Sequence, residues 1–343
     1  MYKNFRSFLF RLDAESAHNL TLRFIRLSGL IPGLRDIIRQ TYQYPGKRVK
    51  AFGLEFKNQV GLAAGYDKDG IGWQGLALLG FSHIELGTVT PLPQFGNQRP
   101  RIFRLVEEEA LLNSMGFPGR GAEFLLNQIL NKKRDELILG VNIGKNTATP
   151  LVSAVEDYRM LITCFAGVAD YLVINISSPN TIGLRRLQAR KALDTLLSEL
   201  VAVRQEQENK LNKKVPLLVK LSPDLDQGAL LDAIEVIIKH GIDGVVAANT
   251  SLAKGRKTDQ GSMRSGGISG GPIKGLSTEI VERINLHTNG SLPIIGVGGI
   301  ASPSDAQAKL DAGAVLIQVY TGLVFRGPGL VKEILQGLSP RES

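Results

Sequence analysis

The chain has 343 residues, which suits either two average domains or one large α/β barrel. Hydrophobic residues make up 43% and charged residues 21%, and this ordinary globular mixture excludes a disordered, collagen-like or coiled-coil protein. The net charge of +9 indicates an anionic partner, while a single cysteine, Cys164, excludes a disulfide framework and a cysteine-based zinc site.

Most of the positive charge lies near the N-terminus. Residues 1–50 contain ten Lys/Arg and three Asp/Glu, which gives this segment +7 and leaves +2 for the other 293 residues. Asp13 can cap a helix in which five apolar residues recur at steps of three and four: Ala17, Leu20, Phe24, Leu27 and Ile31. That helix either docks on the rest of the protein or lies with its apolar side in a lipid surface. An anionic membrane is favoured over nucleic acid, because the chain has no nucleic-acid-binding motif.

The sequence predicts attachment to a membrane without a spanning segment. No stretch is long and apolar enough to cross a bilayer, and no secretory signal is visible. An Arg/Ser-rich leader is also absent, which favours a bacterial protein. We therefore expect a peripheral protein on the cytoplasmic face of the cell membrane.

Eight short β-rich runs, mostly separated by helical patterns, repeat from residue 60 onward. They span 60–65, 83–89, 137–144, 171–177, 216–222, 244–250, 293–299 and 314–320. Most are continuously apolar, as is typical of parallel strands covered on both faces, and helical patterns such as 192–207 and 228–241 lie between them. The repeat predicts a (β/α)8 TIM barrel over residues 56–343, with a small helical extension over residues 1–55. A doubly wound open sheet is the alternative.

Polar or glycine residues stand at or just after the end of nearly every run, where a barrel carries its chemistry. Buried polar groups cost free energy unless they are hydrogen-bonded, so we expect a polar ligand across the barrel mouth. In chain order these residues are Lys68, Thr88, Asn142, Asn175, Lys220, Asn249, Thr250, Gly298, Gly299, Tyr320 and Thr321.

Glycine-rich loops follow the last three runs, at 267–275, 296–306 and 320–329. Barrels commonly hold a phosphate after the last two strands, and glycine lets backbone N–H groups approach phosphate oxygens closely. No GxGxxG fingerprint follows the first run, which argues against a Rossmann fold. These loops therefore predict a phosphorylated ligand.

The segment YLVINISSPNTIGLR (171–185) is the most informative, because its strand leads into a turn that carries Ser178 between amides. An amide both donates and accepts, which suits a heterocycle with carbonyl and N–H groups. Four asparagines and two lysines are expected to face one pocket: Asn113, Asn175, Asn180, Asn249, Lys68 and Lys220. They indicate a flat, polar, anionic ligand. No Ser-His-Asp constellation is apparent, so Ser178 is not expected to be an acyl-transfer nucleophile.

With these motifs, the sequence resembles the class 2 dihydroorotate dehydrogenases, the membrane-associated, quinone-reducing branch of that family. The match runs in order through FRLDAESAHNLT, VGLAAGYDKDG, GTVTPLPQFGNQRPRIFRL, NSMGF, GVNIGKN, NISSPNT, VKLSPDL, ANTS, GGISG, GVGGI and VYTG. The resemblance implies an oxidoreductase of pyrimidine (UMP) biosynthesis with one FMN per subunit. It also implies that dihydroorotate stacks on the flavin and that a membrane quinone arrives from the N-terminal side.

The resemblance also implies three sets of site residues. Flavin contacts fall on Ala64, Gly65, Tyr66, Asp67, Lys68, Thr88, Asn142, Asn175, Lys220, Ala248, Gly270, Gly299, Tyr320 and Thr321. Substrate contacts fall on Lys68, Asn113, Ser114, Met115, Gly116, Phe117, Asn175, Asn180, Asn249 and Thr250. Quinone contacts, between the N-terminal helix and the barrel, fall on His18, Arg104 and Tyr320. The alternatives are a surface position for His18 and a salt bridge from Arg104 to one of the glutamates at 107–109.

Ser178 matches the catalytic base of the family. The resemblance implies that it removes a proton from C5 of (S)-dihydroorotate while the C6 hydride passes to flavin N5, giving orotate. Lys220 would stabilise negative charge on the reduced ring, and Lys68 would pair with the orotate carboxylate. A serine hydroxyl is not ionised at neutral pH, so it must act through a water relay or through proton affinity that develops in the transition state.

Four places depart from the family pattern. Ala248 stands where a threonine is frequent, so only a backbone contact to flavin is expected there. Pro118-Gly119 replaces asparagines, Ile182 replaces a proline, and Gly271 stands where arginine is common. None removes a catalytic group, and all bear on the rigidity of the loops.

Two other functions are compatible with parts of the sequence. A class 1 enzyme, soluble and linked to fumarate or NAD, would carry a cysteine as base and lack the basic extension, so Ser178 and residues 1–55 favour class 2. A catalytically silent flavin-binding barrel at the membrane surface would hold the cofactor without turnover. No nucleic-acid partner is expected, and both a monomer and a homodimer are compatible with the sequence.

Overall fold

A closed barrel of eight parallel strands forms the centre of the protein. The computed structural model describes residues 2–258 and 261–338. The barrel strands follow the order β10-β13-β14-β3-β4-β7-β8-β9. Their bounds are β3 (Val60–Leu62), β4 (His83–Val89), β7 (Ile138–Ile143), β8 (Tyr171–Asn175), β9 (Leu217–Leu221), β10 (Gly244–Ala247), β13 (Ile294–Val297) and β14 (Leu316–Val319). Each lies within one of the eight predicted runs, which confirms the TIM-barrel fold.

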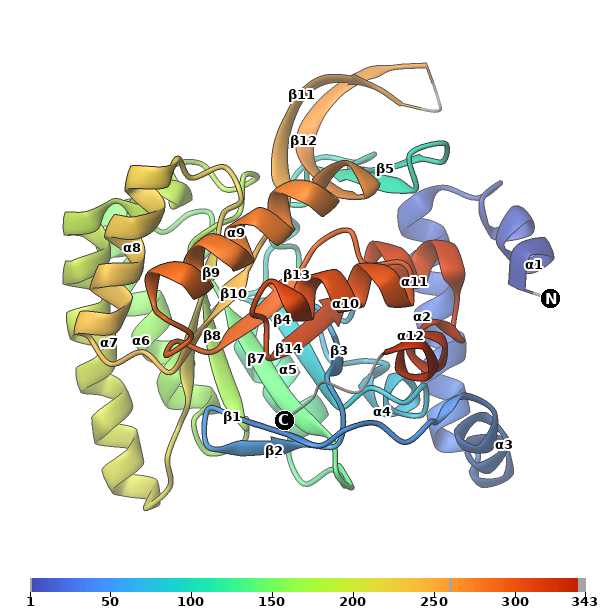
Figure 1. Cartoon of the computed structure of the whole chain (residues 1–343), viewed down its shortest axis with the longest axis horizontal. Helices are drawn as coiled ribbons and strands as arrows, with labels where there is room; N and C mark the ends of the chain where they lie inside the picture. The colour runs from blue at the N-terminus through green and yellow to red at the C-terminus, as the bar shows by residue number, and fades with distance from the viewer. Residues whose placement is uncertain (1, 259–260, 339–343) are drawn as a thin grey trace.

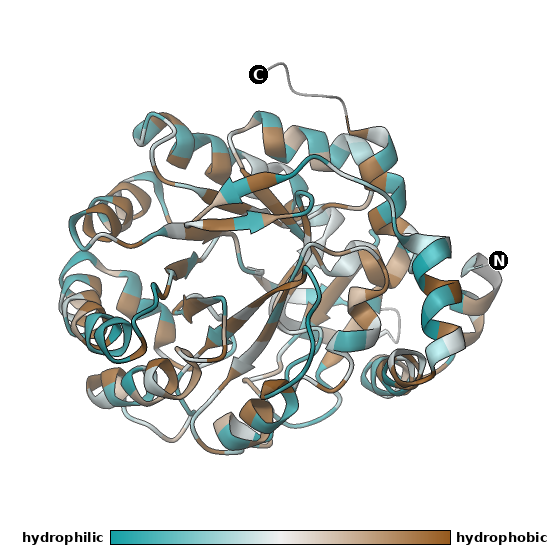
Figure 2. Cartoon of the chain, turned by 90° about the horizontal axis from the view of Figure 1, so that it is seen from below, coloured by the Kyte–Doolittle hydropathy of each residue, from teal (hydrophilic) through white to brown (hydrophobic). Residues whose placement is uncertain are grey.

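Helices surround the strands and bury their apolar sides against them (Figures 1 and 2). They are α4 (Trp73–Ala77), α5 (Gly121–Ile129), α6 (Ala154–Phe165), α7 (Arg190–Leu211), α8 (Gln227–Lys239), α9 (Lys274–His287), α10 (Pro303–Asp311), α11 (Thr321–Arg326) and α12 (Leu330–Gly337), with 3-10 turns η1 (Leu151–Ser153), η2 (Leu184–Gln188) and η3 (Gly271–Ile273). Helices α7 and α8 contain the two helical patterns that the sequence predicts most clearly. Because helices cover the outside of the strands, the barrel strands are almost wholly buried.

A short hairpin closes the bottom of the barrel. Strands β1 (Val49–Ala51) and β2 (Leu54–Phe56) pair antiparallel, and the turn between them carries Phe52. Phe52 and Phe56 pack edge to face, and Phe52 also packs against Tyr171 inside the barrel. Solvent is thereby kept from the N-terminal ends of the strands, and the opposite end remains for ligands.

A second, antiparallel sheet covers part of the mouth, and the sequence pattern did not predict it. Its order is β11-β12-β6-β5, from β11 (Ser251–Lys257), β12 (Met263–Gly270), β6 (Ala110–Asn113) and β5 (Ile102–Leu105). The β11–β12 hairpin rises above the barrel in Figure 1. This sheet brings Asn113 and Gly270, which are far apart in the sequence, to neighbouring strands at the mouth.

Three helices at the N-terminus pack on one side of the barrel: α1 (Tyr2–Leu9), α2 (Ala14–Leu30) and α3 (Pro32–Tyr42). Asp13 caps α2 by accepting a hydrogen bond from the Ser16 N–H, as predicted. A buried ion pair fixes the start of α2, because the Arg101 guanidinium donates to both carboxylate oxygens of Glu15, at 2.7 and 3.1 Å.

The face on which α2 docks differs from the predicted apolar stripe. Phe24 and Leu27, two members of that stripe, are 60% and 50% exposed. Ala17, the first member of the stripe, is buried, and the docked face otherwise carries Leu22 and Gly29, with Gly29 directly against Gly75 of α4. A close approach between two glycines leaves no apolar pattern in the sequence. The apolar periodicity of α2 therefore identified a stripe that is mostly exposed. No described helix is long and apolar enough to cross a membrane.

Candidate active site

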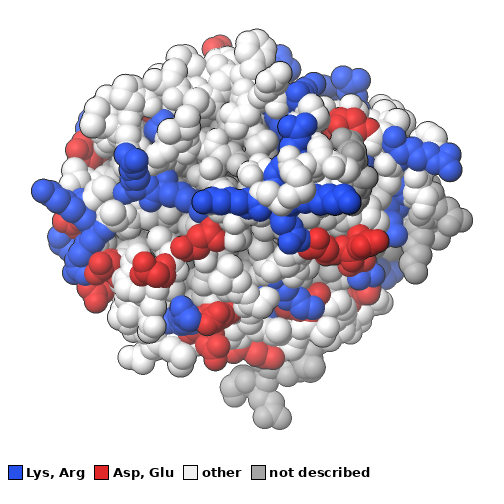
Figure 3. Space-filling model, turned by 90° about the horizontal axis from the view of Figure 1, so that it is seen from above, with Lys and Arg blue, Asp and Glu red and all other residues white. Residues whose placement is uncertain are grey.

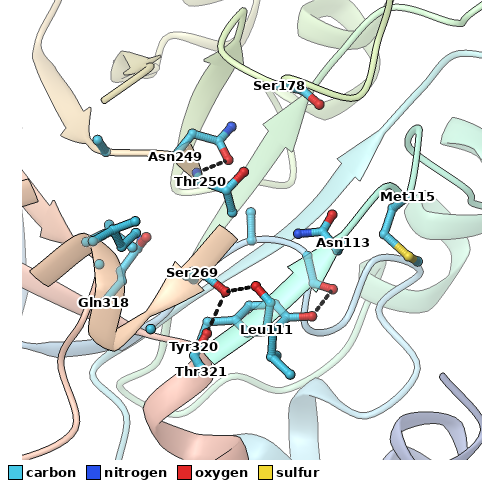
Figure 4. A pocket seen from close by; sticks show the side chains of 18 of the residues that line it. Leu111, Asn113, Met115, Ser178, Asn249, Thr250, Ser269, Gln318, Tyr320 and Thr321 are labelled. Carbon is cyan, nitrogen blue, oxygen red and sulfur yellow. Dashed lines mark hydrogen bonds between the residues drawn. The ribbon is translucent and has the colours of Figure 1, made fainter. Parts of the chain in front are cut away.

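A hollow of about 1100 Å³ opens at the mouth of the barrel, between the strand ends and the second sheet. Figure 4 shows side chains from both sheets around this space, among them Asn113, Ser178, Asn249 and Thr250. Most of the predicted site residues line it: Ala64, Gly65, Lys68, Thr88, Asn113, Met115, Gly116, Phe117, Asn175, Ser178, Asn180, Lys220, Ala248, Asn249, Thr250, Gly270, Gly299, Tyr320 and Thr321.

Four residues predicted to contact flavin or substrate lie outside this lining. Tyr66 and Asp67 face a neighbouring cavity beside α2. Asn142 lies just beneath the floor, where its side-chain oxygen accepts a hydrogen bond from Asn175 at 3.0 Å. Ser114 follows β6, and its N–H donates to the Arg101 carbonyl. Asn142 therefore supports the floor, and Tyr66 lies between the hollow and the N-terminal helices.

The amides form two hydrogen-bonded groups on the side of the hollow that includes Ser178. Asn180 donates to Asn113 at 3.1 Å, which joins the β8 loop to the second sheet. Asn249 donates to the Ser177 hydroxyl at 2.9 Å. Because these bonds connect separate loops, the amides are held in place before a ligand arrives.

Ser178 is 6% exposed, and its Oγ accepts the backbone N–H of Asn180 at 3.3 Å. Within the described residues, no histidine or carboxylate is hydrogen-bonded to this hydroxyl. A Ser-His-Asp triad is therefore not formed around it. Without a neighbouring base, this hydroxyl is not activated for attack on a carbonyl.

Lys68 reaches into the hollow from the loop after β3, and its Nζ donates to the Gly65 carbonyl at 2.7 Å. Burial lowers the pKa of Lys68 to about 8, although the carboxylates of Glu15 and Asp69 act in the opposite direction. An ammonium that burial disfavours gains stability when an anionic ligand pairs with it. Lys68 is therefore a suitable partner for a carboxylate.

The opposite end of the hollow is lined by glycine. Gly270, Gly298 and Gly299 all have positive φ, at 91°, 119° and 72°. A Cβ on Gly299 would lie 2.5 Å from the Lys274 Cα, and a Cβ on Gly270 would lie 2.3 Å from the Glu109 carbonyl oxygen. Neither Gly270 nor Gly299 can carry a side chain without moving these neighbours, so backbone lines this end of the hollow and can approach a phosphate closely.

A stripe of cationic side chains crosses the face around the mouth, with acidic side chains beside it (Figure 3). Figure 3 shows Lys and Arg side chains across the middle of this face. The β11–β12 hairpin contributes four of them: Lys254, Arg256, Lys257 and Arg264. Such a surface raises the local concentration of anionic ligands near the hollow.

A separate cavity lies between the N-terminal helices and the barrel, and His18, Arg104 and Tyr320 all line it. Tyr320 lines the main hollow too, so it separates the two spaces. The rings of His18 and Tyr66 pack edge to face with centroids 5.0 Å apart, and Arg104 donates to the Leu12 carbonyl. Burial, assisted by the charge of Lys68, lowers the pKa of His18 to about 4, so this imidazole is neutral near pH 7.

Two polar residues at the floor were not predicted from the sequence. Gln318 of β14 lines the hollow, and Glu85 of β4 lies beneath it, fully buried. The available signal was a polar residue within an apolar run, in HIELGTV and in AVLIQVY, the same signal that Lys220 gives in PLLVKLS. A side chain inside a barrel strand can face either the barrel interior or the surrounding helices. The alternation of the sequence alone does not show which of the two it faces.

The comparisons with known proteins all identify the same family. The family model described as dihydroorotate dehydrogenase matches residues 47–341. A protein of Yersinia pseudotuberculosis serotype O:1b, named dihydroorotate dehydrogenase (quinone), is 46% identical over 337 residues, covering 97% of this chain and 98% of its own length. A Yersinia pestis bv. Antiqua protein of the same name gives the same figures.

Two solved structures from Eimeria tenella resemble this fold over 95% of the chain. One is a DHODH in complex with ferulenol, with a TM-score of 0.82 and 32% identity over 90% of that chain. The other is a ligand-free DHODH, with a TM-score of 0.82 and 33% identity over 94% of that chain.

Proposed function

This chain belongs to the dihydroorotate dehydrogenase family, a family of oxidoreductases, and we propose that it oxidises (S)-dihydroorotate to orotate with FMN as cofactor and a membrane quinone as electron acceptor. This reaction is the redox step of de novo pyrimidine biosynthesis. Relatives that match nearly the full length and carry "quinone" in their names support this acceptor over fumarate or NAD.

One observation carries the proposal: three asparagines and a lysine surround Ser178 in a single hollow. Asn113, Asn180 and Asn249 come from three separate segments, and Lys68 comes from a fourth. Amides match the alternating carbonyl and N–H groups of a pyrimidine ring, and the lysine matches its carboxylate.

The residues present fit FMN. Gly270, Gly299 and Thr321 would hold its phosphate, at the end of the hollow where side chains are excluded. The ring would lie on the polar floor of Thr88, Asn175 and Lys220. When bound, FMN supplies a ring that accepts a hydride, which is two electrons and one proton, from an organic substrate.

The protein's own residues bind the substrate and move one proton. Lys68 pairs with the substrate carboxylate, and the asparagines fix the ring so that its C5 faces Ser178. The Ser178 Oγ takes the C5 proton as its own hydroxyl proton passes to water. Since no described basic group contacts this hydroxyl, the proton continues to solvent through water. The second sheet covers the hollow and limits the access of bulk solvent.

The cavity behind Tyr320 is the proposed quinone site. His18, Arg104 and Tyr320 supply polar contacts, and Phe10, Leu323 and Val324 supply an apolar wall. The N-terminal helices that form this cavity also expose apolar side chains, so we propose that they attach to the cytoplasmic face of the membrane from which the quinone enters. A two-electron transfer with two protons converts the quinone to its quinol.

Anaerobic addition of dihydroorotate to the purified protein tests the proposal. The yellow absorbance of the oxidised flavin is expected to bleach, and to return on addition of a ubiquinone analogue. Bound flavin that does not bleach would indicate a silent flavin-binding barrel. Bleaching reversed by fumarate or NAD, but not by quinone, would indicate the class 1 reaction instead.

A further inference from the structure

A buried carboxylate lies beneath the floor of the hollow and contacts three other strands. Glu85 of β4 has no exposed surface. Its Oε1 accepts a hydrogen bond from Asn142 Nδ2 on β7 at 2.7 Å, and its Oε2 accepts one from Gln318 Nε2 on β14 at 2.8 Å. Lys220 Nζ on β9 lies 3.7 Å from Oε1.

These contacts identify a charged pair. Both carboxylate oxygens of Glu85 accept from amide N–H donors, and this pattern suits an ionised carboxylate, which has no proton to donate. Lys220 is only 4% exposed, and Glu85 is its ion-pair partner among the described residues. The pair therefore holds one positive and one negative charge at the floor, where little water screens them.

We propose that Glu85 is a positioning residue that compensates the charge of Lys220 and thereby sets the reduction potential of bound FMN. The inference rests on the proposed function, because it requires FMN in the hollow. Lys220 lines the hollow and Glu85 does not, so Glu85 acts through Lys220 and Asn142 rather than by contact. Negative charge that develops on the flavin during reduction is stabilised by a nearby cation, and a carboxylate paired with that cation weakens the effect.

The surroundings of Glu85 allow its charge to be removed without removing its hydrogen bonds. The Oε1 of Gln318 is buried and has no hydrogen-bond partner among the described residues. In Glu85→Gln, rotation of the Gln318 amide would present this oxygen to the new N–H group, while the remaining carbonyl oxygen still accepts from Asn142. The variant is therefore expected to fold and to differ from the wild type mainly in charge.

The test is the reduction potential of bound FMN, measured by anaerobic titration against a reference dye. Glu85→Gln leaves Lys220 uncompensated, so the potential is expected to rise by about 30 mV or more, which is a tenfold change in the ratio of reduced to oxidised flavin for a two-electron couple. Lys220→Met is expected to lower it. The double variant, which again has no net charge at the floor, is expected to return close to the wild-type value.

Asp243→Asn is the matched control. Asp243 pairs with Arg204 at 3.0 Å just before β10, at the opposite end of the barrel, so this variant also loses one negative charge from an ion pair. Its flavin potential is expected to equal that of the wild type. A general effect of destabilisation would shift the control as well.

Two results would overturn the inference: a wild-type potential in FMN-loaded Glu85→Gln, or a shift in the same direction as that of Lys220→Met. If Glu85→Gln alone is insoluble, the double variant Glu85→Gln/Lys220→Met tests the inference. A flavin potential in the double variant as low as that of Lys220→Met would contradict charge compensation. Failure of the proposed function is distinguishable, because the wild-type protein would then hold no FMN or would not bleach with dihydroorotate.

Discussion

At the scale of single residues, Ser178 is the group whose replacement most directly separates chemistry from binding. Its Oγ contacts the backbone of its own loop and no side chain among the described residues, so Ser178→Ala leaves the asparagine groups intact. We expect this variant to retain flavin and orotate but to reduce flavin more slowly by a factor of about 10² to 10⁴, the usual contribution of a positioned proton acceptor. Anaerobic stopped-flow absorbance measures this rate.

Ser177→Ala is the control for Ser178→Ala. The Ser177 hydroxyl connects Asn175 and Asn249, at 3.0 and 2.9 Å, and does not line the hollow. We expect its loss to weaken substrate binding more than it slows the flavin reduction step. Near-normal reduction by Ser178→Ala would show that this serine is not the base.

Lys68 gives the binding of orotate a defined pH dependence. Burial lowers the pKa of Lys68 to about 8 in the free protein, and only the protonated form attracts the orotate carboxylate. Affinity is therefore expected to be constant well below pH 8 and to fall as the pH rises through 8, by up to about tenfold per unit. Titration of the flavin spectrum with orotate between pH 6 and 9.5 measures it. Lys68→Met is expected to bind orotate weakly and with little pH dependence. An orotate affinity of the wild type that does not change with pH would contradict the assignment of Lys68 as the carboxylate partner.

The polar residues at the mouth were not equally predictable from their positions in the strands. Asn175 is the last residue of β8, so the barrel rule alone is enough to bring it to the mouth. Lys220 and Gln318 both occupy the fifth of seven positions in their runs, so position does not distinguish them, and Glu85 lies in the first half of its run. The pairing of Glu85 with Gln318 depends on the register of strands far apart in the sequence, which no local pattern specifies.

At the scale of elements, the eight barrel strands were predictable because most of them are continuous apolar runs. The second, antiparallel sheet at the barrel mouth was not predictable. Strand β5 is four residues long with alternating half-buried and buried side chains, and β11 is mostly exposed. Such strands are stabilised by pairing with distant segments rather than by a hydrophobic pattern of their own.

The contact between α2 and α4 yields a prediction about helix docking. A Cβ on Gly75 would lie 1.9 Å from the Ile25 carbonyl oxygen, so Gly75→Ala must push α2 away from the barrel. We expect a loss of about 1–3 kcal/mol in the free energy of unfolding, as for other overpacked interiors. Faster proteolysis of the N-terminal helices should accompany it. Thermal unfolding and limited proteolysis measure the two effects.

Gly33→Ala in α3 is the matched control for Gly75→Ala. No described atom lies within 4 Å of a Cβ on Gly33, so the same substitution there has room and gains the helix preference of alanine. Its stability is expected to equal or slightly exceed that of the wild type. Equal effects of the two substitutions would show that α2 does not depend on close contact with α4.

At the scale of the whole molecule, the N-terminal helices combine positive charge with exposed apolar side chains. Phe24 and Leu27 of α2 and Ile37 of α3 are 60%, 50% and 63% exposed, and Arg23 and Arg26 lie exposed beside them. Insertion of such side chains into a bilayer is worth up to about 1.5–3 kcal/mol each, and each nearby Lys or Arg adds about 1 kcal/mol at an anionic surface. The face is therefore suited to reversible attachment.

Replacing these three apolar residues by aspartate tests that attachment without altering the barrel. The wild-type protein is expected to float with vesicles that contain phosphatidylglycerol, and to detach in part at high salt because screening weakens the charge contribution. The variant should remain in solution and reduce a long-tailed vesicle quinone slowly. Its flavin should still bleach with dihydroorotate at the wild-type rate, since the mouth hollow lies outside these helices. Leu286→Asp, at a 68% exposed position near the end of α9, is the control and should float normally. If the triple variant floats and reduces the vesicle quinone as well as the wild type does, the N-terminal helices are structural and the membrane contact lies elsewhere.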